Sequence, residues 1–320
     1  MANHRARQSS DRAVLVLPAL RCAALRCAAI RLAIGAAPCL AIGVYFPGRE
    51  KLRLIDSLDP VRDCQQIARL TYRYEFPLDH RRASRISLLR SFAIPSISQV
   101  LLDAGEFMQR TQKRYDDTDI LLSHLIERGY DHPDGRLIIR KMNRMHRRFS
   151  IDNDQHRYIL STLVIEPLRW NRRFGFRPMS RNERVGFFTF WKEIGRRMAI
   201  ADLFETVEDM EAWYEAYERR HMVFAECNRR LADHVLQAFL GKVHPRFRDV
   251  LLAPLDDRLL AAIGRPLPSP LLRQRVERAI RLSGRLSALL PKREPKDRHD
   301  RPRRTYPDGF ALKDVGADPE

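Results

Sequence analysis

Arg114 and Thr118, four residues apart, are the first candidates for a functional site. Residues four apart share one face of a helix, so a guanidinium and a hydroxyl would point the same way. Asp117 lies three residues after Arg114 and is placed to pair with it. The apolar run 120–122 follows, so this face is expected to point inward. An ordinary helix N-terminus with a surface Arg–Asp pair is the alternative.

His146 is the second candidate, because it lies on an apolar stripe. Ile139, Met142, His146 and Phe149 follow one another at offsets of 3, 4 and 3, the spacing of one helix face. An imidazole in such surroundings is typical of an axial haem ligand, since the pocket excludes water and neutral imidazole binds iron. A core histidine bonded to a backbone carbonyl fits the same pattern, so both interpretations stay open.

Two further groups have polar residues on apolar helices. Glu166 and Arg169 flank Pro167, where they can line a cavity beside a helix kink or form a structural ion pair. His221 lies next to Tyr217 on an aromatic stripe and is a second candidate iron ligand.

Other common catalytic motifs are missing from the sequence. There is no glycine-rich phosphate loop, no Gly-x-Ser-x-Gly motif and no His-Glu-x-x-His helix. A carboxylate-bridged di-iron site needs two Glu-x-x-His pairs, and only Glu218 with His221 has that spacing. The five cysteines contain no Cys-x-x-Cys, which excludes a thiolate zinc site or a disulfide framework and favours a reducing compartment.

Helical spacing recurs along the chain and strict apolar/polar alternation is scarce, so we expect an all-α, multi-helix globular domain. Ser180 and Glu183 form a capping box, and Asp59 and Asn153 mark two other helix starts. Residues 207–240 contain neither Gly nor Pro and predict one long helix. The expected helices cover residues 60–74, 81–92, 96–108, 114–128, 136–149, 153–169, 181–198, 207–240 and 271–290.

The formal charge of +18 on 320 residues is concentrated at the ends of the chain. Residues 1–49 hold +6 and residues 271–304 hold +8, which leaves the body only mildly basic. A nucleic-acid enzyme would carry a basic stripe through its folded part, so no nucleic-acid partner is expected.

Composition divides the chain into four segments: an N-terminal extension over 1–50, the main domain over 54–245, a helical segment over 246–290 and a disordered basic tail over 291–320. Three interpretations of the extension stay open: a poor membrane anchor, a targeting segment, or sequence upstream of the true start codon. In each case, deleting residues 1–48 is expected to leave the fold intact.

Several ordered runs of residues together resemble the MpaB-type oxygenase family. This family includes a fungal oxygenase that cleaves a farnesyl chain, and it is related more distantly to the rubber oxygenases, or latex-clearing proteins. The resemblance extends from about residue 54 to 245. Its runs are Leu58–Asp63, Tyr74–Pro77, Gly105–Phe107, Lys113–Thr118, Met145–Phe149, Tyr158–Thr162 and Glu166–Asn171.

The resemblance implies an all-helical fold that binds one haem b, with dioxygen and an apolar, isoprenoid-like substrate as partners. It implies that His146, 28 residues beyond Thr118, is the axial iron ligand. Arg114 and Thr118 would then line the distal pocket, with Asp117 orienting Arg114 and Arg169 as a further cofactor contact. Rubber oxygenases place a lysine where this chain has Asp117, which disfavours polyisoprene and favours a short isoprenoid chain whose double bond is cleaved.

Two functions from different classes are therefore weighed. The first is a haem b-dependent oxygenase, either cytoplasmic or membrane-associated. The second is a non-enzymatic helical protein that contacts membranes through residues 271–290, which have a basic amphipathic pattern. In that pattern the apolar side is formed by Leu272, Val276, Ala279, Ile280, Leu286 and Leu290.

Overall fold

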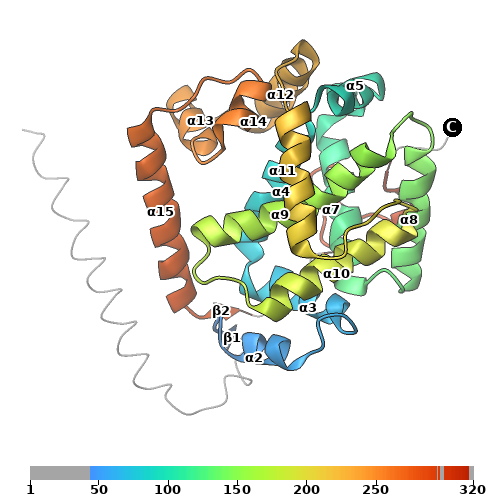
Figure 1. The fold of residues 1–320 in the computed structure, drawn as a ribbon, viewed down its shortest axis with the longest axis vertical. Helices are drawn as coiled ribbons and strands as arrows, with labels where there is room; N and C mark the ends of the chain where they lie inside the picture. The colour runs from blue at the N-terminus through green and yellow to red at the C-terminus, as the bar shows by residue number, and fades with distance from the viewer. Residues whose placement is uncertain (1–43, 294, 296–298, 317–320) are drawn as a thin grey trace, which may run out of the picture. The chain divides into compact units, whose positions relative to one another are not determined.

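The computed structural model describes residues 44–293, 295 and 299–316 (Figure 1). The expected N-terminal extension lies outside the described residues up to position 43. The helices are α2 (Glu50–Ser57), α3 (Cys64–Leu70), α4 (Pro77–Ser91), α5 (Pro95–Asp103), α6 (Glu106–Gln109), α7 (Thr111–Arg128), α8 (Pro133–His146), α9 (Asn153–Phe174), α10 (Arg181–Arg197), α11 (Val207–His221), α12 (Glu226–Leu240), α13 (Pro245–Leu252), α14 (Asp257–Ala262) and α15 (Pro270–Leu289).

The all-α expectation is confirmed for the described part of the chain. Two strands of two residues each, β1 (Val44–Tyr45) and β2 (Lys292–Arg293), form a small ladder. A π-helical turn, Thr71–Glu75, follows α3, and a 3₁₀ turn, Leu312–Asp314, lies near the C-terminus. Across the described residues, no helix is both long and apolar enough to span a bilayer.

The long helix α9 runs through the middle of the helical body and packs against α4, α10, α11 and α15 (Figure 1). Its cap is Asp152, whose carboxylate accepts from the backbone of Gln155 at 2.7 Å while the Gln155 side chain accepts from Asp152 N at 3.0 Å. The expected cap, Asn153, is instead the first helical residue. The helix continues through Pro167 to Phe174, beyond the expected end.

Helix α10 begins at the expected capping box of Ser180 and Glu183. It lies close to α3, because a Cβ at Gly186 would come within 2.6 Å of Ile67 Cγ2. Glycine is therefore required at this helix crossing.

The prediction of a single helix over residues 207–240 is wrong. The structure divides it into α11 and α12, with an extended link over 222–225. Asn228, which is fully buried, donates from its amide nitrogen to Val223 O at 2.9 Å and to Ala262 O at 3.2 Å. The buried side chain thus donates to a carbonyl group that has no partner within an interrupted helix. No Gly or Pro in the sequence indicates this interruption.

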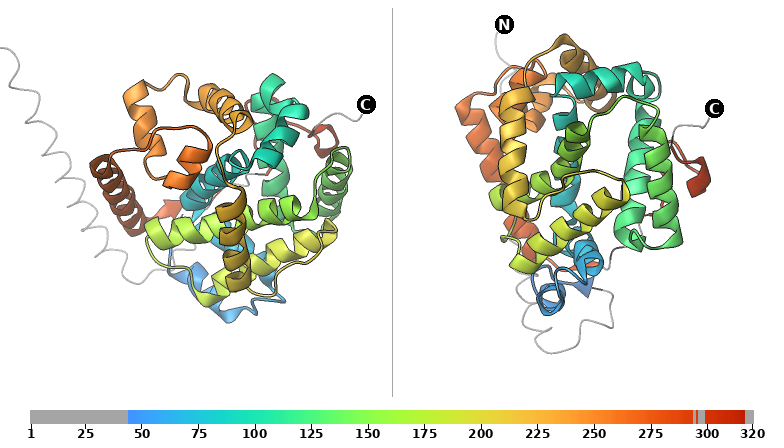
Figure 2. Two further views of the ribbon diagram at one scale, coloured as in Figure 1. Left: turned by 45° about the horizontal axis from the view of Figure 1, so that its top comes forward. Right: turned by 45° about the vertical axis from the view of Figure 1, so that its right-hand side comes forward.

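The tail expected to be disordered is ordered over residues 299–316. It packs beside α7 and α8, as the right-hand view of Figure 2 shows. Lys141 Nζ on α8 donates to Leu312 O, Lys313 O and Val315 O at 3.0, 2.6 and 2.5 Å, and Val315 is fully buried in the main core. The charged composition misled the prediction, because Asp119 of α7 pairs with Arg303 at 2.8 Å and Lys141 of α8 supplies hydrogen-bond donors.

Candidate active site

Helix α7 places Arg114 and Thr118 on one face, as expected. The Arg114 guanidinium donates to Thr118 Oγ1, and Thr118 Oγ1 donates to Arg114 O at 2.9 Å. The guanidinium also lies 5.2 Å from the centroid of the Phe107 ring. Burial lowers the pKa of Arg114, opposed by the charges of Asp117 and Glu106. The group still carries its positive charge at neutral pH, in a partly buried position.

Asp117 does not form the expected ion pair with Arg114. Its carboxylate accepts from Lys113 Nζ at 2.9 Å and from the Tyr306 hydroxyl at 2.6 Å. The neighbouring Asp116 accepts from the backbone and side chain of Thr305 at 2.8 and 2.7 Å. These two carboxylates therefore hold the C-terminal segment against α7, and the guanidinium of Arg114 is positioned by Thr118 instead.

His146 is the last residue of α8 and is partly buried, with its Nδ1 atom fully buried. Among the described residues this nitrogen has no hydrogen-bond partner. Burial lowers the pKa of His146 to about 4, and the charges of His156 and Arg114 add to the effect. The imidazole is therefore neutral at physiological pH, the form that binds a metal. Phe149, expected on the same helix face, lies beyond the helix end and is 39% exposed.

His156 on α9 is the functional candidate that sequence reasoning missed. Its ring lies 5.2 Å from that of His146, with a 54° angle between the planes. Burial lowers its pKa, opposed by Asp152. The connection from α8 to α9 is only six residues, 147–152, so it brings the end of one helix to the start of the next. That short connection was the signal available in the sequence.

Arg169 is not brought to this group of residues. It lies thirteen residues after His156 on α9, about 20 Å along the helix axis. Its guanidinium pairs with Glu215 at 2.8 Å and with Glu211 at 3.5 Å and lies 5.0 Å from the Tyr214 ring centroid. Its contact with a cofactor stays a prediction, and these partners favour the structural ion pair.

Glu166 belongs to a buried ionic cluster centred on Arg90 of α4. Arg90 contacts Glu166 at 2.8 Å, Glu218 at 2.9 Å and Asp256 at 2.5 Å. Burial raises the pKa of Glu218, and Arg90 opposes that rise. Tyr158 donates to Glu218 Oε1 at 3.1 Å, so the cluster is also tied to the aromatic core.

His221, the second candidate ligand, closes α11. Its ring lies 4.4 Å from that of Tyr217, which in turn stacks on Tyr158 at 4.9 Å. The structure therefore places His221 with the aromatic residues Tyr217 and Tyr158, on a different helix from His146.

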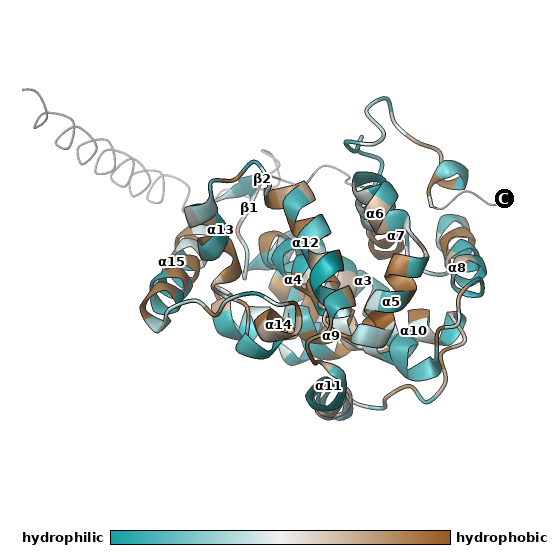
Figure 3. Ribbon diagram, turned by 90° about the horizontal axis from the view of Figure 1, so that it is seen from above, coloured by the Kyte–Doolittle hydropathy of each residue, from teal (hydrophilic) through white to brown (hydrophobic). Residues whose placement is uncertain are grey.

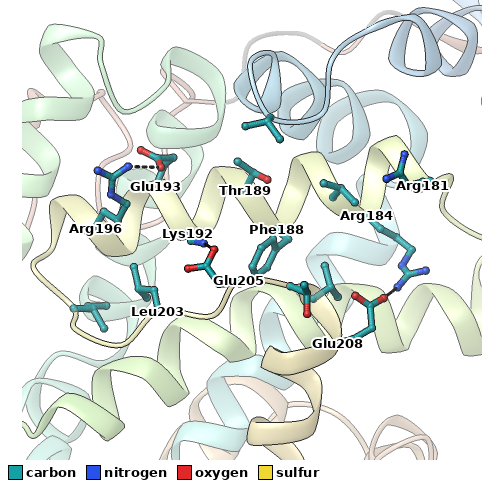
Figure 4. A pocket seen from close by; sticks show the side chains of 15 residues that line it. Arg181, Arg184, Phe188, Thr189, Lys192, Glu193, Arg196, Leu203, Glu205 and Glu208 are labelled. Carbon is teal, nitrogen blue, oxygen red and sulfur yellow. Dashed lines mark hydrogen bonds and ion pairs between the residues drawn. The ribbon is translucent and has the colours of Figure 1, made fainter.

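A cavity of about 1050 Å³ lies between α10 and the segment 200–208 (Figure 4). Its rim is crossed by ion pairs, Lys192 with Glu205 at 2.7 Å and Arg184 with Glu208 at 2.6 Å. A smaller one of about 570 Å³ lies between α6 and α12. Neither is lined by Arg114, Thr118 or His146, so these two cavities are separate from the site.

The donor set fits haem better than a bare metal ion. Within the described residues, no group of three or more His, Cys, Asp or Glu side chains is arranged to hold a metal. Haem supplies four nitrogen ligands itself and needs only an axial side chain from the protein. The unpaired, neutral imidazole of His146 meets that need, and an unpaired buried polar atom otherwise costs about 1–3 kcal/mol.

Comparison with known proteins shows the family of the chain. Residues 83–288 match the catalytic domain of the ER-bound oxygenase mpaB/B′ and rubber oxygenase family, about two thirds of the chain. The chain is 28% identical over 242 residues to the ER-bound oxygenase mpaB of Penicillium roqueforti, covering 68% of this chain and 80% of that protein.

Two proteins of Penicillium brevicompactum are similar as well. The ER-bound oxygenase mpaB′ is 27% identical over 71% of this chain and 58% of its own length. The ER-bound oxygenase mpaB is 26% identical over 59% of this chain and 52% of its own length. The chain thus spans between about half and four fifths of these relatives, and it belongs to the mpaB/rubber oxygenase family.

Proposed function

We propose that this protein is a haem b-dependent oxygenase that cleaves a double bond of an apolar substrate, with an isoprenoid chain as the leading class. Family membership supports an oxygenase over the non-enzymatic alternative. The observation that carries the haem proposal is the buried, unpartnered Nδ1 of His146, an imidazole whose pKa is lowered by burial and further by the charge of Arg114. Haem b, if held there, would supply the redox chemistry for a reaction in which one alkene and one dioxygen give two carbonyl products.

The residues of α7 and α8 have distinct parts in this proposal. His146 would hold the haem through its ring nitrogen, and it stays neutral because burial disfavours its protonation. Arg114 provides N–H donors from a fixed position, since Thr118 both accepts from the guanidinium and donates to the Arg114 carbonyl. Phe107 covers one side of that guanidinium and limits its hydration. A donor held in this way needs little reorganisation when charge develops near it.

Substrate class follows from the relatives and from the departure at Asp117. This carboxylate holds Lys113 and Tyr306, so it is occupied by the C-terminal segment rather than by a ligand. We therefore favour a short isoprenoid chain over a polymer. Because such chains reside in membranes, a peripheral contact with a bilayer is part of the same proposal.

Haem binding is tested by the pyridine haemochrome assay and the Soret band of protein expressed with added haem. His146→Ala should lose haem, whereas His221→Ala should keep it, because Tyr217 already accounts for the position of that ring. His156→Ala should keep haem but change its spectrum, since this ring packs against His146. Retention of a wild-type spectrum by His146→Ala would overturn the ligand assignment.

The reaction is tested with a farnesyl-chain compound and isotopically labelled dioxygen. We expect two carbonyl products, each with one labelled oxygen atom, and no reaction of the saturated analogue. Arg114→Ala should keep haem and lose most of this activity, because the fixed donor is removed. Haem-loaded wild type that consumes no dioxygen with any such alkene would contradict the proposed chemistry.

A further inference from the structure

Helix α15 lies along one edge of the helical body, as Figures 1 and 3 show. A surface helix of a soluble domain normally turns its apolar face inward and its charges outward. Helix α15 does the reverse over much of its length, and none of its residues is buried.

Charged groups attach the inner face of α15 to the body. Glu277 pairs with Arg173 of α9 and with Arg281 at 2.9 Å, and Arg281 Nε also donates to Arg173 O at 3.0 Å. Arg273 pairs with Asp257 of α14 at 2.5 Å. The apolar residue on this side is Ile280, which packs against the small cluster that contains Trp170.

Leucines occupy the outer face. Leu271, Leu282, Leu286 and Leu289 are 57, 59, 54 and 54% exposed. Their spacing of 11, 4 and 3 residues puts them on one face of the helix. This outer leucine row differs from the apolar side expected from the sequence. Only Leu286 belongs to both sets.

Three arginines share the face with the outer leucine row: Arg275, Arg278 and Arg285 are all exposed. Within the described part of the chain, none of them forms an ion pair. The one carboxylate of α15, Glu277, is turned inward to Arg173. The face therefore combines exposed leucines with unneutralised positive charge, which is complementary to anionic headgroups above an apolar layer.

We propose that the outer face of α15 is a docking surface for an anionic lipid bilayer. The leucine side chains would enter the headgroup–acyl boundary while the arginines contact phosphate and carboxylate groups. This inference rests on the proposed peripheral membrane contact and is independent of haem, so haem content and vesicle binding are measured separately.

The experiment uses the full chain and vesicles of phosphatidylcholine, alone or with about one third phosphatidylserine. Binding is measured by cosedimentation. Insertion is measured with Leu282→Trp, through its fluorescence quenching by brominated phosphatidylcholine. The control is Val61→Trp, at a site that is 62% exposed and lies between α2 and α3. Both variants share the same three native tryptophans, so their difference reports the position alone.

We expect the signal from position 282 to shift to the blue and to be quenched on serine-containing vesicles, with no change at position 61. Adding Arg275→Gln, Arg278→Gln and Arg285→Gln should reduce the quenching about tenfold or more at equal lipid, because each surface cation contributes to binding. The matched set Arg62→Gln, Arg85→Gln and Arg136→Gln should have little effect, since these exposed residues lie on other elements.

Other outcomes overturn the proposal. The proposal is wrong if the protein does not bind vesicles. It is also wrong if the protein binds but the fluorescence of Leu282→Trp is not quenched, because another part of the chain then makes the contact. A dimer in vesicle-free solution that Leu282→Gln with Leu286→Gln converts to a monomer would assign the surface to a second copy. Loss of haem with normal vesicle insertion would contradict only the proposed enzyme function.

Discussion

Replacing Arg90 with Met should strongly destabilise the protein, because Arg90 is the shared partner of three carboxylates. The side chain of Arg90 is only 7% exposed, and methionine can occupy much of its volume without its charge. Glu166 and Glu218 are 4% exposed each, so neither can reach water when the cation is removed. The side chain of Asp256 is 42% exposed and can be rehydrated.

The magnitude follows from this difference in exposure. Breaking a buried pair by removing one partner costs about 3–5 kcal/mol, mainly because a buried charge is left uncompensated. Protonation of one glutamate limits the cost. Arg169, whose guanidinium lies 3.9 Å from Glu166 and 3.8 Å from Glu218, compensates part of the remaining charge. Tyr158 and Tyr214 still donate to the two carboxylates. We therefore expect Arg90→Met to lower the free energy of unfolding by about 3–5 kcal/mol at neutral pH. This loss is smaller than the sum for two buried, uncompensated carboxylates.

The free energy of unfolding is measured by urea denaturation of Arg90→Met. Arg85→Met on the exposed side of the same helix is the control and should change it by less than about 0.5 kcal/mol. Adding Glu218→Gln to Arg90→Met should recover part of the lost free energy of unfolding. The pKa of Glu218 is already raised by burial and rises further without Arg90, so the folded variant takes up a proton as the pH falls. The difference in the free energy of unfolding between wild type and Arg90→Met should therefore become smaller from pH 7 toward pH 5. A loss below about 1 kcal/mol would refute the reasoning.

Three further predictions concern other parts of the molecule. Deleting residues 1–43 should retain the fold. Deletion to residue 48, which the sequence predicts to leave the fold intact, should instead lower the melting temperature, because Tyr45 is buried and donates to Tyr74 O at 3.0 Å. Tyr306→Phe should loosen the C-terminal segment by about 1 kcal/mol through loss of its bond to Asp117, measured as faster amide exchange there. Burial lowers the pKa of His80 to about 3, so wild-type stability should fall between about pH 6.5 and 3 as the unfolded chain takes up the proton. Urea titrations across this range should show a flatter profile for His80→Phe, and an unchanged slope would contradict the buried neutral ring.

Comparison of residues 207–240 with residues 111–128 shows why some elements were predictable. Arg114 and Thr118 meet because a helix places residues four apart on one face, and this geometry depends on local chain alone. The helix break at 222–225 depends on Asn228 and on Ala262, forty residues from the start of the link. No local pattern reports such a contact.

The candidate site shows the same division. The all-α class, the capping box at Ser180 and the common face of Arg114 and Thr118 could be predicted from the residues alone, since each follows from backbone geometry within a few residues. Long-range packing brings His156 against His146 and Asp117 to Tyr306, 189 residues away, and no local pattern predicts either contact. Long-range packing also turned the leucines of α15 outward, because Glu277 and Arg273 found partners on α9 and α14. Such pairings depend on which surfaces pack together, and the free energy that selects them is shared among residues far apart in the chain.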